Sequence, residues 1–265
     1  MAAPLLTVEG ITVSFSGLAA LDDVSLGVGE HEIVSLIGPN GAGKTTLFNV
    51  VCGFVRPTSG QVAFRGKELR HHRPADLARM RIARTLQGVK LWNGLTVVEN
   101  VMAGAQATLR AGLVSALLGL PRSSREERLL RERALAMLEG LGVADAADRL
   151  PPSLPYGVQK RVAIARALLL EPELLLLDEP ASGLSETEMG ELAQLILGLR
   201  DDMGILLVEH HMDFVMSISD RVVVLNFGRV IASGTPDEVR SNQEVTTAYL
   251  GEQVDRAAPA VEASG

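Results

Sequence analysis

The residues best suited to chemistry form one glycine-rich segment. It fits the pattern G-x-x-x-x-G-K-[ST] completely and is followed by a second threonine: Gly38, Pro39, Asn40, Gly41, Ala42, Gly43, Lys44, Thr45 and Thr46. Glycines let successive backbone N–H groups turn towards an anion, and a helix beginning near Lys44 adds the positive end of its dipole. Lys44 would supply charge to the β- and γ-phosphates, and Thr45 a hydroxyl ligand for Mg²⁺. The segment predicts a site for ATP and Mg²⁺.

Two carboxylates follow an apolar run further along the chain. Leu174–Leu177 leads directly into Asp178 and Glu179. In phosphoryl transfer one acid holds Mg²⁺, directly or through water, and another residue positions the attacking water. We assign Asp178 to the metal and Glu179 to the water, as general base. Acidic residues often end strands, so this pair alone is weak evidence for a catalytic site. The phosphate-binding loop upstream strengthens the assignment.

A histidine pair follows a third apolar run, Ile205–Val208, and the carboxylate Glu209. His210 could donate a hydrogen bond to the γ-phosphate and so distinguish ATP from ADP. His211 is expected to face solvent. The alternative is two surface histidines at the beginning of a helix.

The elements that position these groups can also be read from the chain. Ile33–Ile37, apolar except for Ser35, and the two apolar runs above are typical of parallel strands buried on both faces. Ligands of open parallel sheets bind at the carboxyl ends of the strands, so all three sets of groups are expected at one edge. Three segments indicate an antiparallel layer near the N-terminus: Leu5–Phe15, Val24–Val28 and Gln61–Arg65.

Between about Val89 and Leu168 the pattern becomes helical, with apolar spacing in 97–102 and 126–141. Ser124 and Glu127 predict a capping box for the second helix. A hairpin around Gly228 and a short helix at 236–241 follow. We expect an α/β fold: a P-loop ATPase core with a parallel sheet, the N-terminal antiparallel layer and an inserted helical subdomain. One nucleotide-binding domain would span residues 1–251, with the helical subdomain at about 89–168 and a flexible tail at 252–265.

Composition narrows the choice of partners. A formal net charge of −7 argues against nucleic acid as the main partner, because phosphate neutralisation needs a basic face. The single cysteine, Cys52, excludes a disulfide framework and is expected in the core of the helix after the loop. No signal peptide and no apolar stretch of about 20 residues is seen, so we expect a cytoplasmic protein.

A further segment lies just upstream of the acidic strand, at the start of an expected helix: Leu154, Pro155, Tyr156, Gly157, Val158 and Gln159. It resembles the signature of the nucleotide-binding subunits of ATP-binding-cassette transporters. The resemblance to that family extends from about Leu5 to Gly251. The resemblance implies that each signature contacts ATP on a second ATPase subunit, homologous or identical, in a two-fold pair. Pro155 stands where serine is commonest, and Val158 replaces a usual glutamine.

The resemblance also implies roles for single residues. Phe15 looks like the aromatic residue that stacks on adenine. Gln87 looks like the glutamine that contacts Mg²⁺ and senses the membrane partner, and His210 like the switch histidine. Ser182–Ser185 resembles the loop that communicates between the two sites, with Ser185 where aspartate is usual.

Within the family the chain is most similar to the ATP-binding subunits of branched-chain amino acid importers. Five segments and the insertion Gly112–Arg133 support this: 83–87, 155–157, 208–213, 232–236 and 248–251. The similarity implies two transmembrane permease subunits, a periplasmic or extracellular solute-binding protein, and a place on the cytoplasmic face of the cell membrane. Relatives of this group can serve amides or urea, so the cargo stays open.

Several alternatives remain at this point. Leu91, Trp92 and Leu95 form either a docking surface for the permease or ordinary packing of the helical region. A non-transport ATPase acting on DNA or ribosomes would usually carry two cassettes or a long coiled coil, and neither is present. The third alternative is a nucleotide switch that binds ATP without hydrolysing it. The missing hydroxyl in the signature is the only feature that supports it, and the presence of Lys44 and Glu179 argues against it. Export instead of import is disfavoured by family analogy alone.

Overall fold

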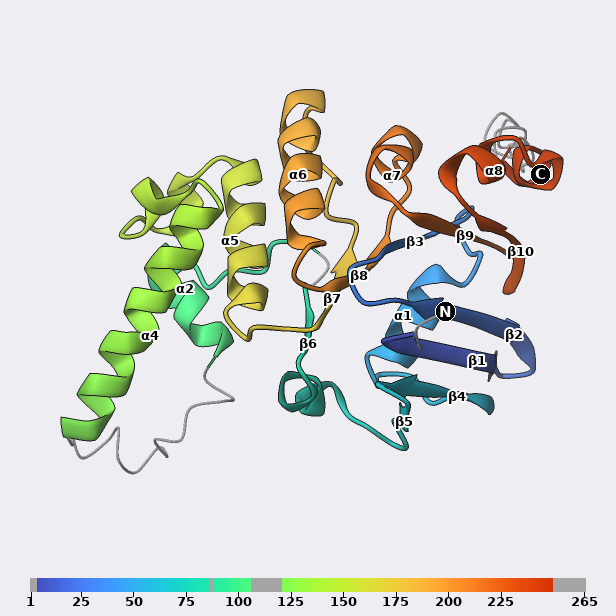
Figure 1. Ribbon diagram of the computed structural model, residues 1–265, viewed down its shortest axis with the longest axis horizontal. Coiled ribbons are helices and arrows are strands. Elements are labelled where there is room, and N and C mark those ends of the chain that lie inside the picture. Colours follow the sequence, from blue (N-terminus) through green and yellow to red (C-terminus); the bar gives the residue numbers. More distant parts are fainter. Residues whose placement is uncertain (1–3, 86–87, 106–120, 250–265) are drawn as a thin grey trace, which may run out of the picture. The chain divides into compact units, whose positions relative to one another are not determined.

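The computed structural model describes residues 4–85, 88–105 and 121–249. The chain divides into two compact units, one formed by residues 1–71 and 208–265 and the other by residues 72–207 (Figure 1). The phosphate-binding loop belongs to the first unit. The acidic pair and the signature belong to the second.

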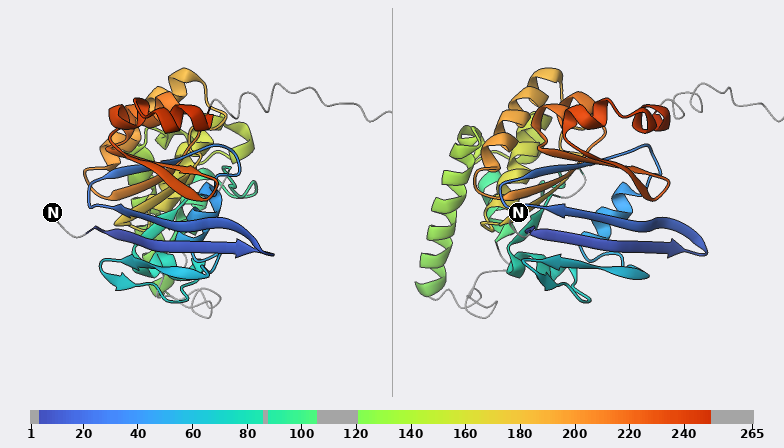
Figure 2. Two further views of the ribbon diagram at one scale, coloured as in Figure 1. Left: turned by 90° about the vertical axis from the view of Figure 1, so that its right-hand side faces the viewer. Right: turned by 45° about the vertical axis from the view of Figure 1, so that its right-hand side comes forward.

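The first unit contains the expected antiparallel layer. Its strands are β1 (Leu6–Phe15), β2 (Leu18–Val28), β4 (Ser59–Phe64) and the short β5 (Lys67–Glu68), which lie in the order β2-β1-β4-β5. Figure 2 shows the three longer strands, β1, β2 and β4, side by side. Leu6, Val8, Ile11 and Val13 of β1 are buried while the residues between them are less so. The alternation read from the sequence is therefore that of a half-buried strand, as predicted.

A second group of strands in this unit carries the phosphate-binding loop. β3 (Ile33–Ile37) pairs in parallel with β9 (Arg221–Asn226), which forms an antiparallel hairpin with β10 (Arg229–Gly234). Three helices complete the unit: α1 (Lys44–Val51), α7 (Met212–Ile218) and α8 (Pro236–Arg240). Ile37, Val215, Val224 and Val239 share one core cluster. The predicted hairpin and short helix are confirmed.

The second unit holds the other buried strands. β6 (Ile82–Arg84) pairs in parallel with β7 (Leu174–Asp178), and β8 (Gly204–Val208) neighbours β7 on its other side. Every residue of β7 and β8 is buried, which confirms the interpretation of both apolar runs. A 3₁₀ helix, Pro74–Met80, leads into β6.

The helices of this unit are α2 (Val97–Gly104), α4 (Pro121–Gly140), α5 (Tyr156–Leu168) and α6 (Glu186–Leu199), with 3₁₀ turns at Ala144–Ala146 and Pro151–Ser153. α2 packs against α4 and α5, and α4 packs against α5 (Figure 1). The predicted apolar stripe of α4 is buried at Leu130, Ala134 and Leu138, as is Leu141 just after the helix. The bounds of the helical subdomain stay a prediction.

One detail of the sequence interpretation is wrong. Ser124 does not begin α4, because the helix already begins at Pro121, a residue type suited to the first helical position. Capping boxes instead begin α2 at Thr96, α6 at Ser185 and α8 at Thr235.

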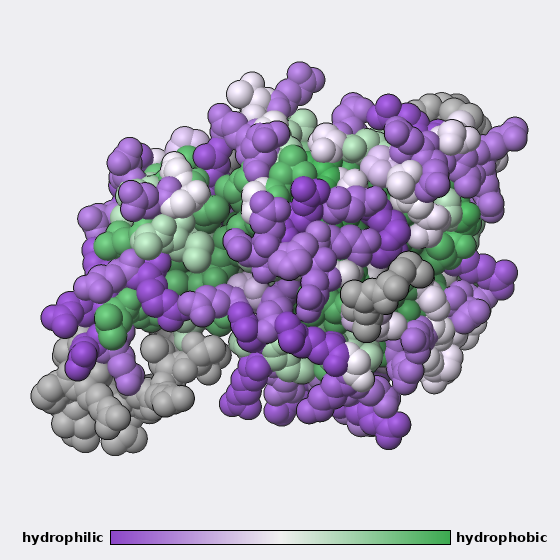
Figure 3. Space-filling model, viewed as in Figure 1, coloured by the Kyte–Doolittle hydropathy of each residue, from purple (hydrophilic) through white to green (hydrophobic). Residues whose placement is uncertain are grey.

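On the face shown in Figure 3, hydrophilic residues lie outermost over most of the area, with apolar residues visible between them. Within the described residues no helix has both the length and the hydropathy needed to cross a membrane. Cys52 is a buried free thiol, as expected of a small core residue.

Candidate active site

The glycine-rich segment forms the turn from β3 into α1, and its glycines are required by the backbone. Gly38 and Gly43 both have positive φ, at 150° and 104°. A Cβ on Gly43 would lie 2.7 Å from the carbonyl oxygen of Ala20, and one on Gly38 would overlap the carbonyl oxygen of Leu225. Side chains other than hydrogen are therefore excluded at both positions.

The turn of the β9–β10 hairpin braces this loop. The Gly228 N–H donates to the carbonyl oxygen of Ala42 at 3.0 Å, and the Gly228 carbonyl accepts from the N–H of Asp22 at 2.8 Å. Sequence analysis recognised Gly228 as a turn residue but assigned it no role at the site. The contact joins parts of the chain that are distant in sequence, so no local pattern could have revealed it.

Lys44 begins α1 and folds back over the loop. Its Nζ donates to the carbonyl oxygens of Gly38 at 2.6 Å and Pro39 at 2.8 Å, and the residue is 9% exposed. Thr45 is exposed and Thr46 half-buried. Within the described residues no side chain caps the first turn of α1. Its N–H groups and the Lys44 ammonium form an arrangement suited to an anion such as a phosphate.

His210 follows β8 and is held by the buried carboxylate before it. Glu209 is fully buried, and its Oε2 accepts from the backbone N–H groups of His210 at 2.8 Å and His211 at 3.2 Å. The two imidazole rings lie 4.3 Å apart between centroids. The expectation that His211 is the solvent-facing member is wrong: His210 is exposed and His211 half-buried, because Glu209 turns the chain at this point. Glu209 is a positioning group that sequence analysis passed over.

Phe15 ends β1 and lies in the same unit as the loop. It is 52% exposed and precedes a tight turn in which Ser16 and Gly17 have φ of 49° and 88°. An exposed aromatic ring is open to stacking on a flat ligand. Gln87 lies outside the described residues.

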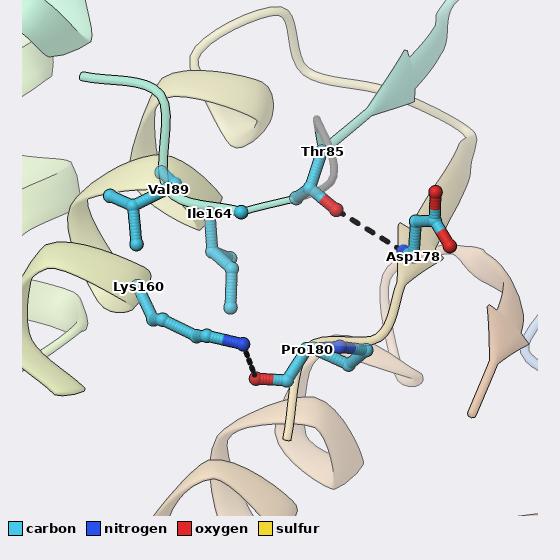
Figure 4. Close-up of a pocket in the computed structure, with 8 residues that line it drawn as sticks. Thr85, Val89, Lys160, Ile164, Asp178 and Pro180 are labelled. Carbon is cyan, nitrogen blue, oxygen red and sulfur yellow. Dashed lines mark hydrogen bonds between the residues drawn. The ribbon is translucent and has the colours of Figure 1, made fainter. Parts of the chain in front are cut away.

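In the second unit, Asp178 is the last residue of β7 and Glu179 follows it directly, so the pair lies at the end of the strand as predicted. Asp178 is buried, and its backbone N–H donates to the hydroxyl oxygen of Thr85 at 3.4 Å (Figure 4). Glu179 is half-buried and adopts a left-handed conformation with φ of 47°. For a residue other than glycine this conformation costs about 1 kcal/mol or more, so the surroundings must hold it.

A buried lysine supplies part of that support. Lys160 in α5 donates from Nζ to the carbonyl oxygen of Glu179 at 3.0 Å and to that of Pro180 at 2.7 Å, the second of which is drawn in Figure 4. It lines a pocket with an empty volume of about 300 Å³ together with Thr85, Val89 and Asp178. Sequence analysis assigned no role to Lys160, and no local pattern distinguishes it from other lysines of the chain.

The signature begins α5. Pro155 occupies the N-cap position, and no side-chain hydrogen bond caps the helix within the described residues. Because proline has no hydroxyl, Pro155 cannot offer one at the N-terminus of α5. A Cβ on Gly157 would lie 2.5 Å from Glu188 Oε1, and Gln159 Nε2 donates to the Leu154 carbonyl at 2.9 Å. Tyr156 is 42% exposed.

Comparisons with known proteins identify the family. A family model described as "ABC transporter" matches residues 21–182, and one described as "Branched-chain amino acid ATP-binding cassette transporter" matches residues 229–255. The high-affinity branched-chain amino acid transport ATP-binding protein LivG of Salmonella typhimurium is 46% identical over 254 residues, 95% of this chain and 100% of LivG. BraF of Pseudomonas aeruginosa, with the same description, is 42% identical over the same shares.

Solved structures give the same result for the fold. The crystal structure of the ADP conformation of an ATP-binding cassette of an ABC transporter has a TM-score of 0.82 and 31% identity, covering 95% of this chain and 100% of that one. The expected fold class, a P-loop ATPase core with an antiparallel layer and helices, is confirmed. The chain belongs to the ATP-binding-cassette transporter family, as one of its ATP-binding, ATP-hydrolysing subunits.

Proposed function

We propose that this chain is the ATP-hydrolysing subunit of a multi-chain importer for branched-chain or related amino acids. The observation that carries the proposal is the end-to-end similarity of 42–46% to LivG and BraF, which are named as branched-chain amino acid transport proteins. Residues 229–255 also match the family model described as a branched-chain amino acid ATP-binding cassette transporter. An importer of amides or urea is the alternative cargo class.

The residues of the site fit ATP and Mg²⁺. The uncapped first turn of α1 and the Lys44 ammonium suit the phosphates, and Phe15 suits the adenine ring. The Thr45 hydroxyl, the Asp178 carboxylate and the Gln87 amide are oxygen ligands of the kind Mg²⁺ prefers. The ion, when bound, would neutralise charge on the β- and γ-phosphates.

The proposed reaction needs three actions from this chain. Lys44 would leave the carbonyls of Gly38 and Pro39 for the β- and γ-phosphates, which offer full negative charge instead of dipoles. Glu179 would accept a proton from the attacking water, and His210 would donate to the γ-phosphate. The Leu154–Gln159 signature would contact ATP on the second subunit, through the N–H groups of α5 and not through a serine hydroxyl.

The proposed complex contains a second ATPase subunit, two transmembrane permease subunits and a periplasmic or extracellular solute-binding protein. This chain would lie on the cytoplasmic face of the cell membrane. The docking surface we propose is Trp92 with Leu91 and Leu95. Trp92 is exposed, while Asn100 accepts its N–H at 2.8 Å and donates to its carbonyl at 3.1 Å, so the turn that presents the ring is held in place.

The test is uptake of labelled leucine, isoleucine and valine, with an amide and urea for comparison, in cells whose only copy is wild type or Glu179→Gln. We expect uptake of the branched-chain amino acids to collapse in the variant, because ATP binds but is not hydrolysed. A response of the amide or urea alone would reassign the cargo and keep the motor role. If no solute responded although both proteins were present, import itself would be contradicted.

A further inference from the structure

Lys160 joins the signature helix to the backbone of the proposed general base. It lies one helical turn after Tyr156, whose ring centroid is 5.3 Å from its Nζ. The residue is 7% exposed, and its ammonium reaches the two consecutive carbonyl oxygens of Glu179 and Pro180. Figure 4 shows the side chain extending from α5 towards the loop after β7.

These two contacts act on the part of the loop that is strained. A buried ammonium is costly unless it is hydrogen-bonded, and bonds from a charged donor are about twice as strong as neutral ones. Because the two acceptors are successive carbonyls, the bonds orient the peptide planes on both sides of Pro180. The left-handed conformation of Glu179, with φ of 47°, is thereby held from its C-terminal side.

We propose that Lys160 is a positioning residue for ATP hydrolysis: it holds the Glu179 backbone so that the carboxylate is aimed at the attacking water. The inference rests on the proposed role of Glu179 as general base. Lys160 touches neither nucleotide nor water in this role. Since Tyr156 and Gly157 lie in the same first turns of α5, a displacement of the signature would also move the ammonium that holds the Glu179 backbone.

The test replaces the ammonium by a side chain of similar length. The tagged full-length chain carrying Lys160→Met is purified with its complex from membranes of its native cell, and phosphate release and ATP binding are measured. We expect kcat to fall about 10- to 100-fold, since small displacements of a reacting group cost that much. KM and the Kd for ATP should stay at wild-type values, because the phosphate-binding loop is untouched. Lys67→Met, an exposed lysine in β5, is the matched control and should keep the wild-type kcat.

Two further variants separate positioning from folding. Lys160→Arg keeps a cationic donor and should recover part of kcat. In a Glu179→Gln background, Lys160→Met should not lower the residual rate further, because the group that it positions is already gone. A lowered melting temperature with loss of ATP binding in both Lys160 variants would show a structural role only and overturn the inference.

The outcomes also distinguish this inference from the proposed function. If Glu179→Gln hydrolyses ATP at the wild-type rate, the general-base assignment falls and the role of Lys160 falls with it. If Glu179→Gln is inactive while Lys160→Met keeps full kcat, the proposed function stands and only the positioning role is rejected.

Discussion

At the scale of single residues, the site is built from backbone conformations that ordinary side chains avoid. The left-handed glycines of the phosphate-binding loop and the left-handed Glu179 are each held by a neighbour: Gly228 contacts the loop, and Lys160 the Glu179 carbonyl. Strain of this kind persists only where the surroundings over-determine it, and it concentrates at functional sites. In both the loop and the acidic pair, a residue that is distant in the sequence thus stabilises a strained local conformation.

Gly228→Ala tests this stabilisation at the loop. Gly228 has φ of 77°, and an added Cβ would lie 2.8 Å from the Ala20 carbonyl oxygen, whereas Gly66 has φ of 71° with no described atom within 4 Å. Both variants carry the left-handed penalty, about 1 kcal/mol, which is all we expect for Gly66→Ala. Gly228→Ala should cost about 2–3 kcal/mol in unfolding free energy and weaken ATP binding. Denaturant unfolding and ATP titration measure both effects; equal behaviour of the two variants would contradict the bracing role.

At the scale of elements, α6 is fixed at its beginning by a reciprocal cap next to the signature. Glu188 accepts from the Ser185 N–H at 2.9 Å and the Ser185 hydroxyl at 2.7 Å, and the Glu188 N–H donates back to that hydroxyl at 3.4 Å. The backbone hydrogen bond from Ser185, followed by the hydroxyl, holds the pKa of Glu188 below its ordinary value. Ser185 therefore has a capping role here.

The lowered pKa of Glu188 predicts a pH-dependent contribution to stability. A carboxyl whose pKa is depressed by folding stabilises the protein above its unfolded pKa, about 4.3, and loses this as pH falls through the folded pKa. Glu188→Gln should therefore lower the melting temperature at neutral pH, and the difference from wild type should shrink in acid. Glu186→Gln, an exposed acid in the same first turn, is the control. A difference independent of pH would contradict the assignment.

At the scale of the whole molecule, the proposed function requires a surface through which the chain passes ATP-driven motion to the permease subunits. Trp92 is half-exposed beside the helices of the second unit, with the Arg166 guanidinium 5.3 Å from its ring centroid. Burial lowers the pKa of Arg166 from its ordinary value, and its Nη1 donates to the Lys90 carbonyl at 3.0 Å. A cation stacked on the ring keeps the ring oriented while the rest of its surface is open to a partner.

Trp92→Ala is expected to keep ATP hydrolysis but lose transport, because the site is intact while the apolar contact to the permease is removed. Phe54→Ala removes an aromatic side chain of similar exposure, 55% against 52%, from the other unit and should leave transport unchanged. Uptake and phosphate release are measured on the same preparations. Full coupling in Trp92→Ala would reject the docking surface and leave ordinary packing as the explanation.

The sequence by itself determined the parts of this protein that depend on local order. The phosphate-binding loop is a continuous motif that follows β3, which is apolar except for Ser35. β7 and β8 are apolar runs that lead to Asp178 and Glu179 and to His210. Period-two and helical spacing predicted the antiparallel layer and the buried face of α4. These features can be predicted without a structure because each pattern is formed by residues that are close together in the sequence.

Only the tertiary structure decided which side chains support these groups. Glu209 beneath His210, Gly228 against Ala42, and Lys160 on Glu179 are ordinary residue types in ordinary positions along the chain. Lys160 and Glu179 are 19 residues apart, and no periodicity relates them. Burial brings them together, since a buried ammonium must find acceptors and a strained backbone must find a donor. The sequence thus names the reacting groups, and the packing determines how they are held.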